Sequence, residues 1–192
     1  MKLFLHGWAT SPRTEKNKKF FQEVVKVWWN KILIFPFAQK NRDYDLQFEL
    51  DSQKFIDHNP HVDIECAMAS EDIEVLIKQI KEYNSLYFCG WRMGYHLDIV
   101  KQIWNLKELF DGKIISGNSS WSLMWCKYAY DQDIETTFKI WLGLLNVKMI
   151  THWWTDRYPD KTDEDRLEEL RNYWEALPIY KIREQEYEVF EL

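Results

Sequence analysis

Short apolar runs, each long enough for one β-strand, alternate along this chain with stretches whose apolar residues recur at helical spacing. The first run, Lys2–Leu5, is followed by Phe21, Val24, Val25 and Trp28, which share one face of a helix with about 3.6 residues per turn. Further strand-like runs occupy residues 31–35, 63–68, 85–89, 113–116 and 147–150. Since alternating strands and helices form βαβ units, the pattern predicts a three-layer α/β fold, with a mostly parallel sheet and helices on both faces.

The helices expected between the later runs have recognisable starts and apolar faces. Ser70 can cap the first of them, and Thr162 with Asp165 resembles a capping box at the start of the last. The expected buried faces are Ile73, Leu76, Ile77 and Ile80; Leu97, Val100 and Trp104; Trp121, Met124, Trp125 and Tyr128; and Leu167, Leu170 and Trp174. Residues 178–182 and 187–190 form the last two apolar runs, and we expect them to pair as a C-terminal hairpin.

The composition is that of a globular protein, and we expect a single α/β domain over residues 1–192. A chain with 46% hydrophobic and 17% aromatic residues can bury enough apolar surface to offset the entropy lost on folding. The sequence contains 11 Trp residues. They can fill the core, line an aromatic binding cleft or anchor a partner surface, and the last role leaves room for a homodimer.

Charge and cysteine content argue against several kinds of partner. The 25 Lys and Arg residues against 31 Asp and Glu give a net charge of −6, without a basic stripe for nucleic acid. Cys66, Cys89 and Cys126 are widely spaced and odd in number, which favours a reducing, cytoplasmic compartment over a disulfide framework. The first residues resemble a strand rather than a signal peptide, and no apolar run is long enough for a membrane span. We therefore expect neither nucleic acid nor membrane as a partner.

A metal site is considered at His58 and His61, which have Asp57 and Asp63 nearby. No third and fourth ligands follow at the spacing typical of zinc sites. We interpret the segment as a solvated loop, and we expect no metal and no other cofactor.

Residues that follow the strands of a parallel sheet share the edge at which ligands bind. Here that edge is expected to collect His6-Gly7, Phe37-Ala38, Gly90-Trp91, Asn118-Ser119 and Thr151-His152. Sequence positions far apart would thus meet in one place.

Ser119 follows a strand and precedes a helix, so a sharp turn there would lift its hydroxyl clear of the sheet. A serine needs a base to remove its proton, and His152 at the end of the next strand is the candidate. Asp131 or Asp133 could orient the imidazole. The alternative interpretation is structural: Ser119 would be a helix cap, and His152 a hydrogen-bonded residue at a strand end.

Several short motifs occur in a fixed order over nearly the whole chain. They are Leu5–Gly7, Lys31–Ala38, Arg42–Asp45, Leu86–Met93, Gly112–Ser122, Trp141–Leu145, Thr151–Trp153 and Pro178–Ile182. In this order they resemble the dipeptidase E and cyanophycinase family of serine peptidases. The matching family patterns include K-I-L-Y-I-P-x-A, G-G-G-N-T, G-K-x-x-x-G-x-S-A-G-A, and G-L-G-L-L followed by P-H-Y or P-H-F.

The resemblance implies a flavodoxin-like fold of the class I glutamine amidotransferase type. It also implies a hydrolase without a cofactor that acts on a small peptide or amide. Ser119 takes the position of the nucleophile and His152 that of the base. The family's acid falls near Asp131, with Asp133 as the second candidate.

The family's oxyanion hole maps onto backbone N–H groups of Gly90, Trp91 and Ser120, where this chain departs from the family pattern. Of three glycines in the first turn only Gly90 is kept, and Arg92 replaces an Asn. Trp121 stands in the helix after the nucleophile, where the family has Gly, and it is expected to crowd the helix or reach the pocket. We assign Arg92 and Trp121 to substrate binding.

These departures leave two further interpretations. A catalytically inactive relative could keep the fold as a binding module, with Arg92 holding a carboxylate or phosphate. The Trp residues that would fill or line the former cleft are Trp91, Trp121, Trp125, Trp153 and Trp154. A degenerate α/β-hydrolase is suggested by Leu5–Trp8 and Cys89–Gly94. In that class Arg92 would occupy the nucleophile position, and a guanidinium cannot attack a carbonyl.

Overall fold

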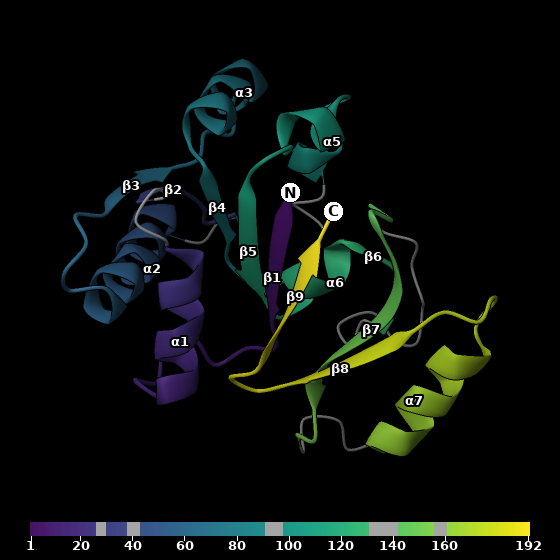
Figure 1. Ribbon diagram of the computed structural model, residues 1–192. Coiled ribbons are helices and arrows are strands. Elements are labelled where there is room, and N and C mark those ends of the chain that lie inside the picture. The colour runs from purple at the N-terminus through teal and green to yellow at the C-terminus, as the bar shows by residue number, and fades with distance from the viewer. Residues whose placement is uncertain (26–29, 38–42, 91–97, 131–141, 156–160) are drawn as a thin grey trace.

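A computed structural model describes residues 1–25, 30–37, 43–90, 98–130, 142–155 and 161–192 (Figure 1). Its strands are β1 (Lys2–His6), β2 (Lys31–Phe35), β3 (Glu65–Met68), β4 (Ser85–Phe88), β5 (Ile114–Asn118), β6 (Cys126–Tyr130), β7 (Leu145–Trp153), β8 (Ile179–Arg183) and β9 (Tyr187–Glu191). Its helices are α1 (Glu15–Val24), α2 (Tyr44–His58), α3 (Ile73–Glu82), α5 (Leu106–Leu109), α6 (Ser120–Met124) and α7 (Asp163–Asn172).

The strands form two sheets. The larger sheet has the order β3-β2-β4-β5-β1-β9, in which β9 is antiparallel to β1 and the other pairs are parallel. The smaller sheet has the order β6-β7-β8 and is wholly parallel. The predicted α/β class with mostly parallel strands is confirmed, but the single sheet expected from the sequence is not: residues 147–150 lie in β7, which belongs to the smaller sheet.

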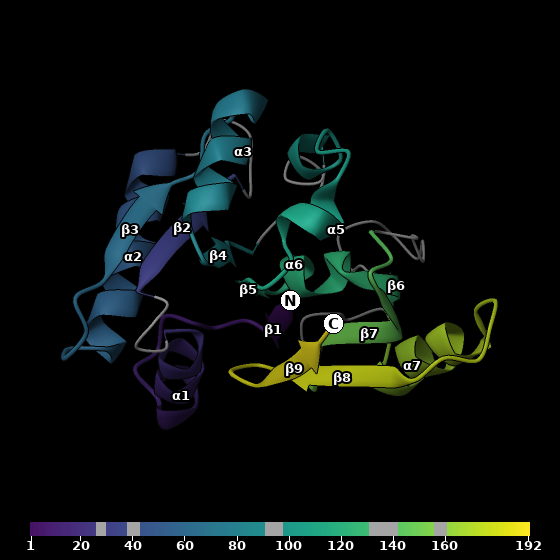
Figure 2. The same cartoon turned by 45° about the horizontal axis from the view of Figure 1, so that its top comes forward.

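Helices cover both faces of the larger sheet, because successive side chains of its strands point to opposite faces. In β1, Phe4 packs with residues of α1 and α2, whereas Leu3 and Leu5 belong to the core that contains α3, α5 and α6. Figure 2 shows α1 and α2 on one side of this sheet and α3, α5 and α6 on the other. The core that contains Leu3 and Leu5 also includes Met149 and Ile182 of the smaller sheet, so one apolar cluster joins the two sheets.

The predicted C-terminal hairpin is wrong. Strand β8 pairs with β7 in the smaller sheet, and β9 pairs with β1 in the larger one. The chain therefore changes sheets at residues 184–186. Both runs have the composition of strands, but which strand each one meets is decided by distant partners that local sequence does not reveal.

Three of the predicted helix faces also need correction. Helix α6 ends at Met124, and Tyr128 lies in β6. The sequence does not distinguish the two elements, because a short buried helix and a buried strand have the same apolar character. Trp104 and Trp174 are 88% and 82% exposed and do not face the core. The capping box of Thr162 and Asp165 is confirmed, while α3 is capped by Asp72, whose backbone N–H donates to Ser70.

Trp121 holds α6 against the larger sheet. Its side chain is fully buried and stacks on Phe88, with 3.5 Å between the ring centroids. An added Cβ at Gly117 would lie 3.2 Å from the Trp121 Cβ and 2.9 Å from the Phe88 carbonyl oxygen. The absence of a side chain at Gly117 thus makes the room that Trp121 fills.

We predict that Trp121→Ala lowers the free energy of unfolding by about 3–5 kcal/mol, because it removes a stacked, fully buried ring and leaves a cavity. Urea denaturation measures the change. The matched control is Trp104→Ala at an exposed Trp, which we expect to change it by no more than about 0.5 kcal/mol. Equal effects of the two substitutions would contradict this account of α6.

Candidate active site

Ser119 occupies a strained turn between β5 and α6. Its backbone has φ 55° and ψ −127°, a conformation that L-residues rarely adopt and that costs about 1–3 kcal/mol. The turn is held by the carbonyl oxygen of His6, which accepts hydrogen bonds from Ser119 N at 2.9 Å and from Ser122 Oγ at 2.7 Å. The end of β1 thus fixes the turn that presents the Ser119 hydroxyl.

His152 lies near the carboxyl end of β7, where the pairing with β8 becomes irregular between Ile150 and Trp153. Its own φ is 56°, and such irregularities re-aim a side chain out of the regular strand pattern. The result is a distance of 2.7 Å between Ser119 Oγ and His152 Nε2. The structure therefore brings together the two residues that the sequence proposed as nucleophile and base.

Glu184, directly after β8, completes the arrangement. Its Oε1 lies 2.7 Å from His152 Nδ1. A carboxylate there accepts a hydrogen bond from Nδ1–H, which leaves Nε2 unprotonated and able to take the hydroxyl proton of Ser119. Asp131 and Asp133, the acids expected from the sequence, lie outside the described residues, and the position beside Nδ1 is taken by Glu184.

Glu184 reaches His152 because the turn after β8 passes very close to the end of β1. An added Cβ at Gly7 would lie only 2.0 Å from the Arg183 carbonyl oxygen. Gly7 N donates to Glu186 O at 2.9 Å, and Gln185 N donates to Trp8 O at 3.0 Å. Only glycine fits at position 7 in this arrangement.

Glu184 is absent from the residues predicted from the sequence, because the hairpin expected over residues 178–190 places it in a turn. A pattern that could have revealed it is shared with Ser119 and His152: each is a reactive side chain at or just after the carboxyl end of a parallel strand.

Gly90 lies directly against the nucleophile. A Cβ at this position would be 2.0 Å from Asn118 Oδ1 and 2.9 Å from Ser119 Cβ. Ser120 is the first residue of α6 and is buried. These two of the three expected oxyanion residues therefore adjoin Ser119 in space or in sequence, whereas Trp91 lies outside the described residues.

The substrate-binding role predicted for Trp121 does not fit its position, since the side chain is fully buried against Phe88. Arg92 lies outside the described residues, and with it the nucleophile position of the α/β-hydrolase interpretation. An aromatic ring, that of Trp8, lies near the imidazole: its centroid is 5.8 Å from that of His152, edge to face.

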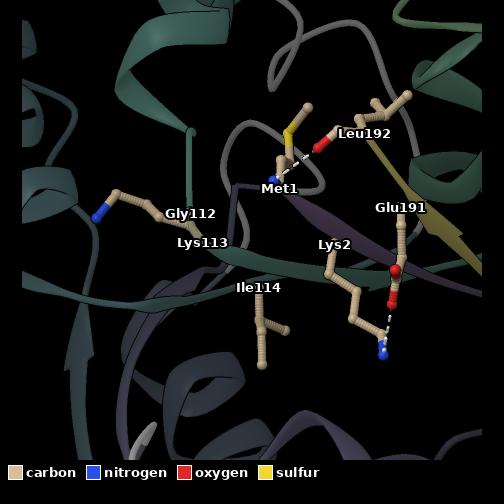
Figure 3. Close-up of a pocket in the computed structure, with 7 residues that line it drawn as sticks. All are labelled: Met1, Lys2, Gly112, Lys113, Ile114, Glu191 and Leu192. Carbon is tan, nitrogen blue, oxygen red and sulfur yellow. Dashed lines mark hydrogen bonds and ion pairs between the residues drawn. The ribbon is translucent and has the colours of Figure 1, made fainter.

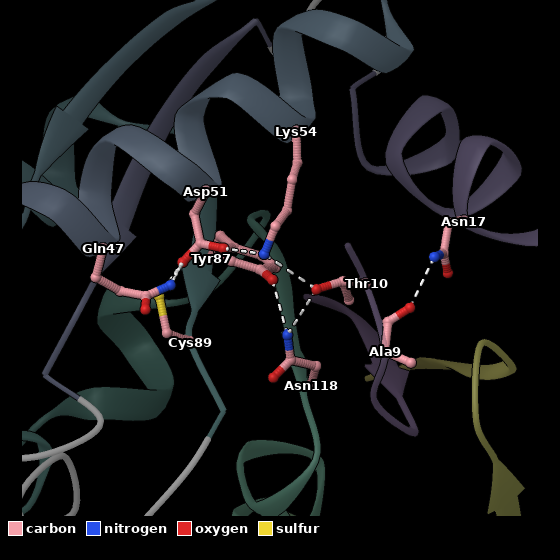
Figure 4. Close-up of polar contacts among 9 residues, drawn as sticks. All are labelled: Ala9, Thr10, Asn17, Gln47, Asp51, Lys54, Tyr87, Cys89 and Asn118. Atoms are coloured by element: carbon pink, nitrogen blue, oxygen red, sulfur yellow. Dashed lines mark hydrogen bonds and ion pairs between the residues drawn. The ribbon is translucent and has the colours of Figure 1, made fainter. Parts of the chain in front are cut away.

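A buried polar cluster ties α2 to the ends of β4 and β5 (Figure 4). The Asp51 carboxylate accepts from Gln47 Nε2 at 2.6 Å, from Lys54 Nζ at 2.7 Å and from the Cys89 thiol at 2.5 Å. Lys54 also donates to Thr10 Oγ1, which accepts from Asn118 Nδ2. Since Cys89 precedes Gly90 and Asn118 precedes Ser119, the cluster restrains both turns that border the nucleophile.

His6 is a second buried imidazole near the site. Burial lowers its pKa from 6.5 to about 4, although a hydrogen bond with Asn17 and the charge of Glu184 act in the opposite direction. His6 is therefore neutral at physiological pH.

A surface hollow lies away from this arrangement, at the amino ends of β1 and β5 (Figure 3). It is lined by Met1, Lys2, Gly112, Lys113, Ile114, Glu191 and Leu192. Because Ser119 follows the opposite end of β5, this hollow is not part of the candidate active site.

In the described part of the chain, no group of three or more His, Cys, Asp or Glu residues is arranged to hold a metal ion. No helix in that part is both long and apolar enough to cross a membrane. No disulfide joins Cys66, Cys89 and Cys126.

No family model and no curated protein sequence matches the chain. Its structure is similar to that of a peptidase from an acI-B1 actinobacterium, with a TM-score of 0.66, 15% identity, and coverage of 95% of this chain and 80% of that one. It is also similar to a protein from Listeria monocytogenes EGD-e that is provisionally described as peptidase E, with a TM-score of 0.62, 16% identity, and coverage of 100% and 98%.

This chain has the peptidase E-like fold. The structural resemblance predicted from the ordered motifs is confirmed. Within the peptidase E-like fold, the catalytic roles of Ser119, His152 and Glu184 stay predictions.

We predict that Gly90→Ala displaces the nucleophile turn, because the new methyl group would overlap Asn118 Oδ1 and press on Ser119 Cβ. The expected result is a fall of about 10²-fold or more in the reaction of Ser119 with a fluorophosphonate probe. The control is Ser70→Ala, in the connection between β3 and α3, and its labelling is expected to equal that of the wild type.

We predict that His6 makes the protein less stable in acid. The pKa of His6 is about 4 in the folded protein and close to 6.5 in the unfolded chain. The contribution of neutral His6 to the free energy of unfolding is therefore complete above pH 6.5 and is lost as the pH falls toward 4. The full loss is about 3 kcal/mol. Urea denaturation between pH 7 and pH 4.5 should show a shallower decline in His6→Phe than in the wild type, and parallel declines would contradict the prediction.

Proposed function

We propose that the protein is a serine-type hydrolase, related to peptidase E, that cleaves a small peptide or amide. The observation that carries the proposal is a pair of hydrogen bonds made by the two ring nitrogens of His152. Nε2 lies 2.7 Å from Ser119 Oγ, and Nδ1 lies 2.7 Å from Glu184 Oε1. This is the arrangement of nucleophile, base and orienting acid that acyl-transfer enzymes on unrelated folds share.

In the proposed reaction, Ser119 Oγ attacks the substrate carbonyl while its proton passes to His152 Nε2. Glu184 stabilises the resulting imidazolium and keeps its Nδ1 proton directed at the carboxylate. His152 then protonates the leaving amine, and a water molecule deprotonated by the same imidazole hydrolyses the acyl-enzyme. Backbone N–H groups at Gly90 and Ser120 are the candidates for stabilising the tetrahedral oxyanion.

Two features of the site support chemistry over a purely structural contact. Ser119 and His152 both have φ near 55°, a strain that folds tolerate where a side chain must be aimed precisely. Both residues are also more than 90% buried. A hydrogen bond between them is strengthened by the low local dielectric, and a small substrate fits such a shielded pair better than a folded protein does.

We predict that a fluorophosphonate probe labels the wild-type protein at Ser119. Ser119→Ala should abolish labelling, and Glu184→Gln should slow it by at least about 100-fold because an amide cannot stabilise the imidazolium or fix its tautomer. The matched control is Glu186→Gln in the same turn, whose carboxylate pairs with Lys16 at the surface and should leave labelling unchanged. Labelling is quantified by intact-protein mass spectrometry.

Turnover is tested in parallel with a library of dipeptides and amides. Absence of both labelling and turnover in correctly folded wild-type protein would overturn the proposal. Saturable binding of a library member without cleavage would then support the binding-module interpretation.

A further inference from the structure

Two buried polar atoms, one in Glu184 itself and one in the neighbouring His6, have no hydrogen-bond partner among the described residues. They are Nδ1 of His6 and Oε2 of Glu184. His6 has no exposed surface, and Glu184 Oε1 is already engaged by His152. Buried polar atoms are nearly always hydrogen-bonded, so each of these two requires an explanation.

The hydrogen-bonding character of His6 Nδ1 follows from its neighbour Asn17. The Asn17 side-chain NH₂ group donates to the carbonyl oxygens of Ala9 and Pro12, both at 2.8 Å. The Asn17 Oδ1 atom therefore faces His6 Nε2 at 3.1 Å and can only accept a hydrogen bond. Nε2 must carry the proton, so Nδ1 of the neutral ring is an acceptor.

His6 and Glu184 belong to the same small region. His6 pairs with Tyr187 in the β1–β9 ladder, and their rings stack with centroids 6.5 Å apart. Glu184 precedes Tyr187 by three residues. The two side chains also interact electrostatically, since the charge of Glu184 acts to raise the pKa of His6.

Two hydrogen-bond acceptors cannot bond to each other, but one water molecule can donate a hydrogen bond to each of them. Buried waters typically satisfy such pairs of polar atoms. We propose that a buried water bridges His6 Nδ1 and Glu184 Oε2, so that His6 and Asn17 act as positioning residues for the carboxylate that orients His152. This inference rests on the proposed hydrolase function for its kinetic consequence, but not for the bridge itself.

The bridge would restrict rotation of the Glu184 carboxylate. With only Oε1 engaged, the group can turn about its last side-chain bond, and the hydrogen bond to His152 lengthens. With Oε2 also held, the carboxylate presents a fixed oxygen to Nδ1. His6 would then serve the site twice, through its carbonyl oxygen at the Ser119 turn and through its ring at Glu184.

Two substitutions of His6 separate the roles of its ring nitrogens. His6→Asn keeps a polar atom near the position of Nδ1 and gives up the contact with Asn17. His6→Gln keeps a polar atom near the position of Nε2 and gives up the acceptor that faces Glu184. Both variants replace the ring with a neutral amide, so each is the control for the other.

The first readout requires no activity. A high-resolution crystal structure of the wild type should show an ordered water within hydrogen-bond distance of both His6 Nδ1 and Glu184 Oε2. In NMR spectra, the downfield proton resonance of His152 Nδ1–H should move upfield in His6→Gln, because a loosened hydrogen bond deshields its proton less. It should stay near the wild-type position in His6→Asn.

The second readout is the rate at which a fluorophosphonate labels Ser119. We expect about a tenfold loss in His6→Gln, the size of one buried hydrogen bond, and a loss of less than about threefold in His6→Asn. Thermal denaturation establishes that both variants are folded at the temperature of the assay.

The outcomes are distinguishable. A site without the bridging water, or an unchanged His152 resonance in His6→Gln, overturns the inference even if Ser119 is labelled normally. Equal losses in both variants would show a merely structural role for the ring and would also overturn it. If wild-type Ser119 is not labelled, the proposed function fails, while the crystal structure and the His152 resonance still decide whether the bridge exists.

Discussion

The carbonyl oxygen of His6 is the point on which the candidate site depends. It accepts hydrogen bonds from the backbone of Ser119 and from the side chain of Ser122, and thereby ties the end of β1 to the strained turn after β5. One residue further on, Gly7 admits the chain that carries Glu184. The end of β1 therefore positions both the nucleophile and the acid, while His152 comes from the smaller sheet.

This arrangement explains why strain can persist at Ser119 and His152. A positive φ at each of two non-glycine residues costs on the order of 1–3 kcal/mol per residue, which an isolated loop would relax. Here each turn is joined to a buried strand, and the apolar cluster that contains Leu5 and Trp121 also contains Met149 and Ile182. Relaxing either turn would disturb packing shared by the two sheets.

The sequence was informative where the controlling interactions are local. Apolar runs predicted β1, β2 and β4, the Thr162–Asp165 pair predicted the start of α7, and the strand-to-helix turn singled out Ser119. It failed where partners are distant in the chain. The strand pairing of residues 179–191 depends on β7 and β1, and the role of Glu184 depends on that pairing, so neither could follow from local pattern.

The departures from the dipeptidase E motifs acquire a steric meaning in the structure. A glycine is needed where a side chain would collide, and Gly90 is kept at the position where a Cβ would overlap Asn118 and press on Ser119. The Trp that replaces a small residue in the helix after Ser119 is buried in the core, where Gly117 gives it room beside Phe88. The bulk gained at Trp121 is thus accommodated in the packing between α6 and β4. The geometry that links Ser119, His152 and Glu184 does not require the small residue that the family has at that position.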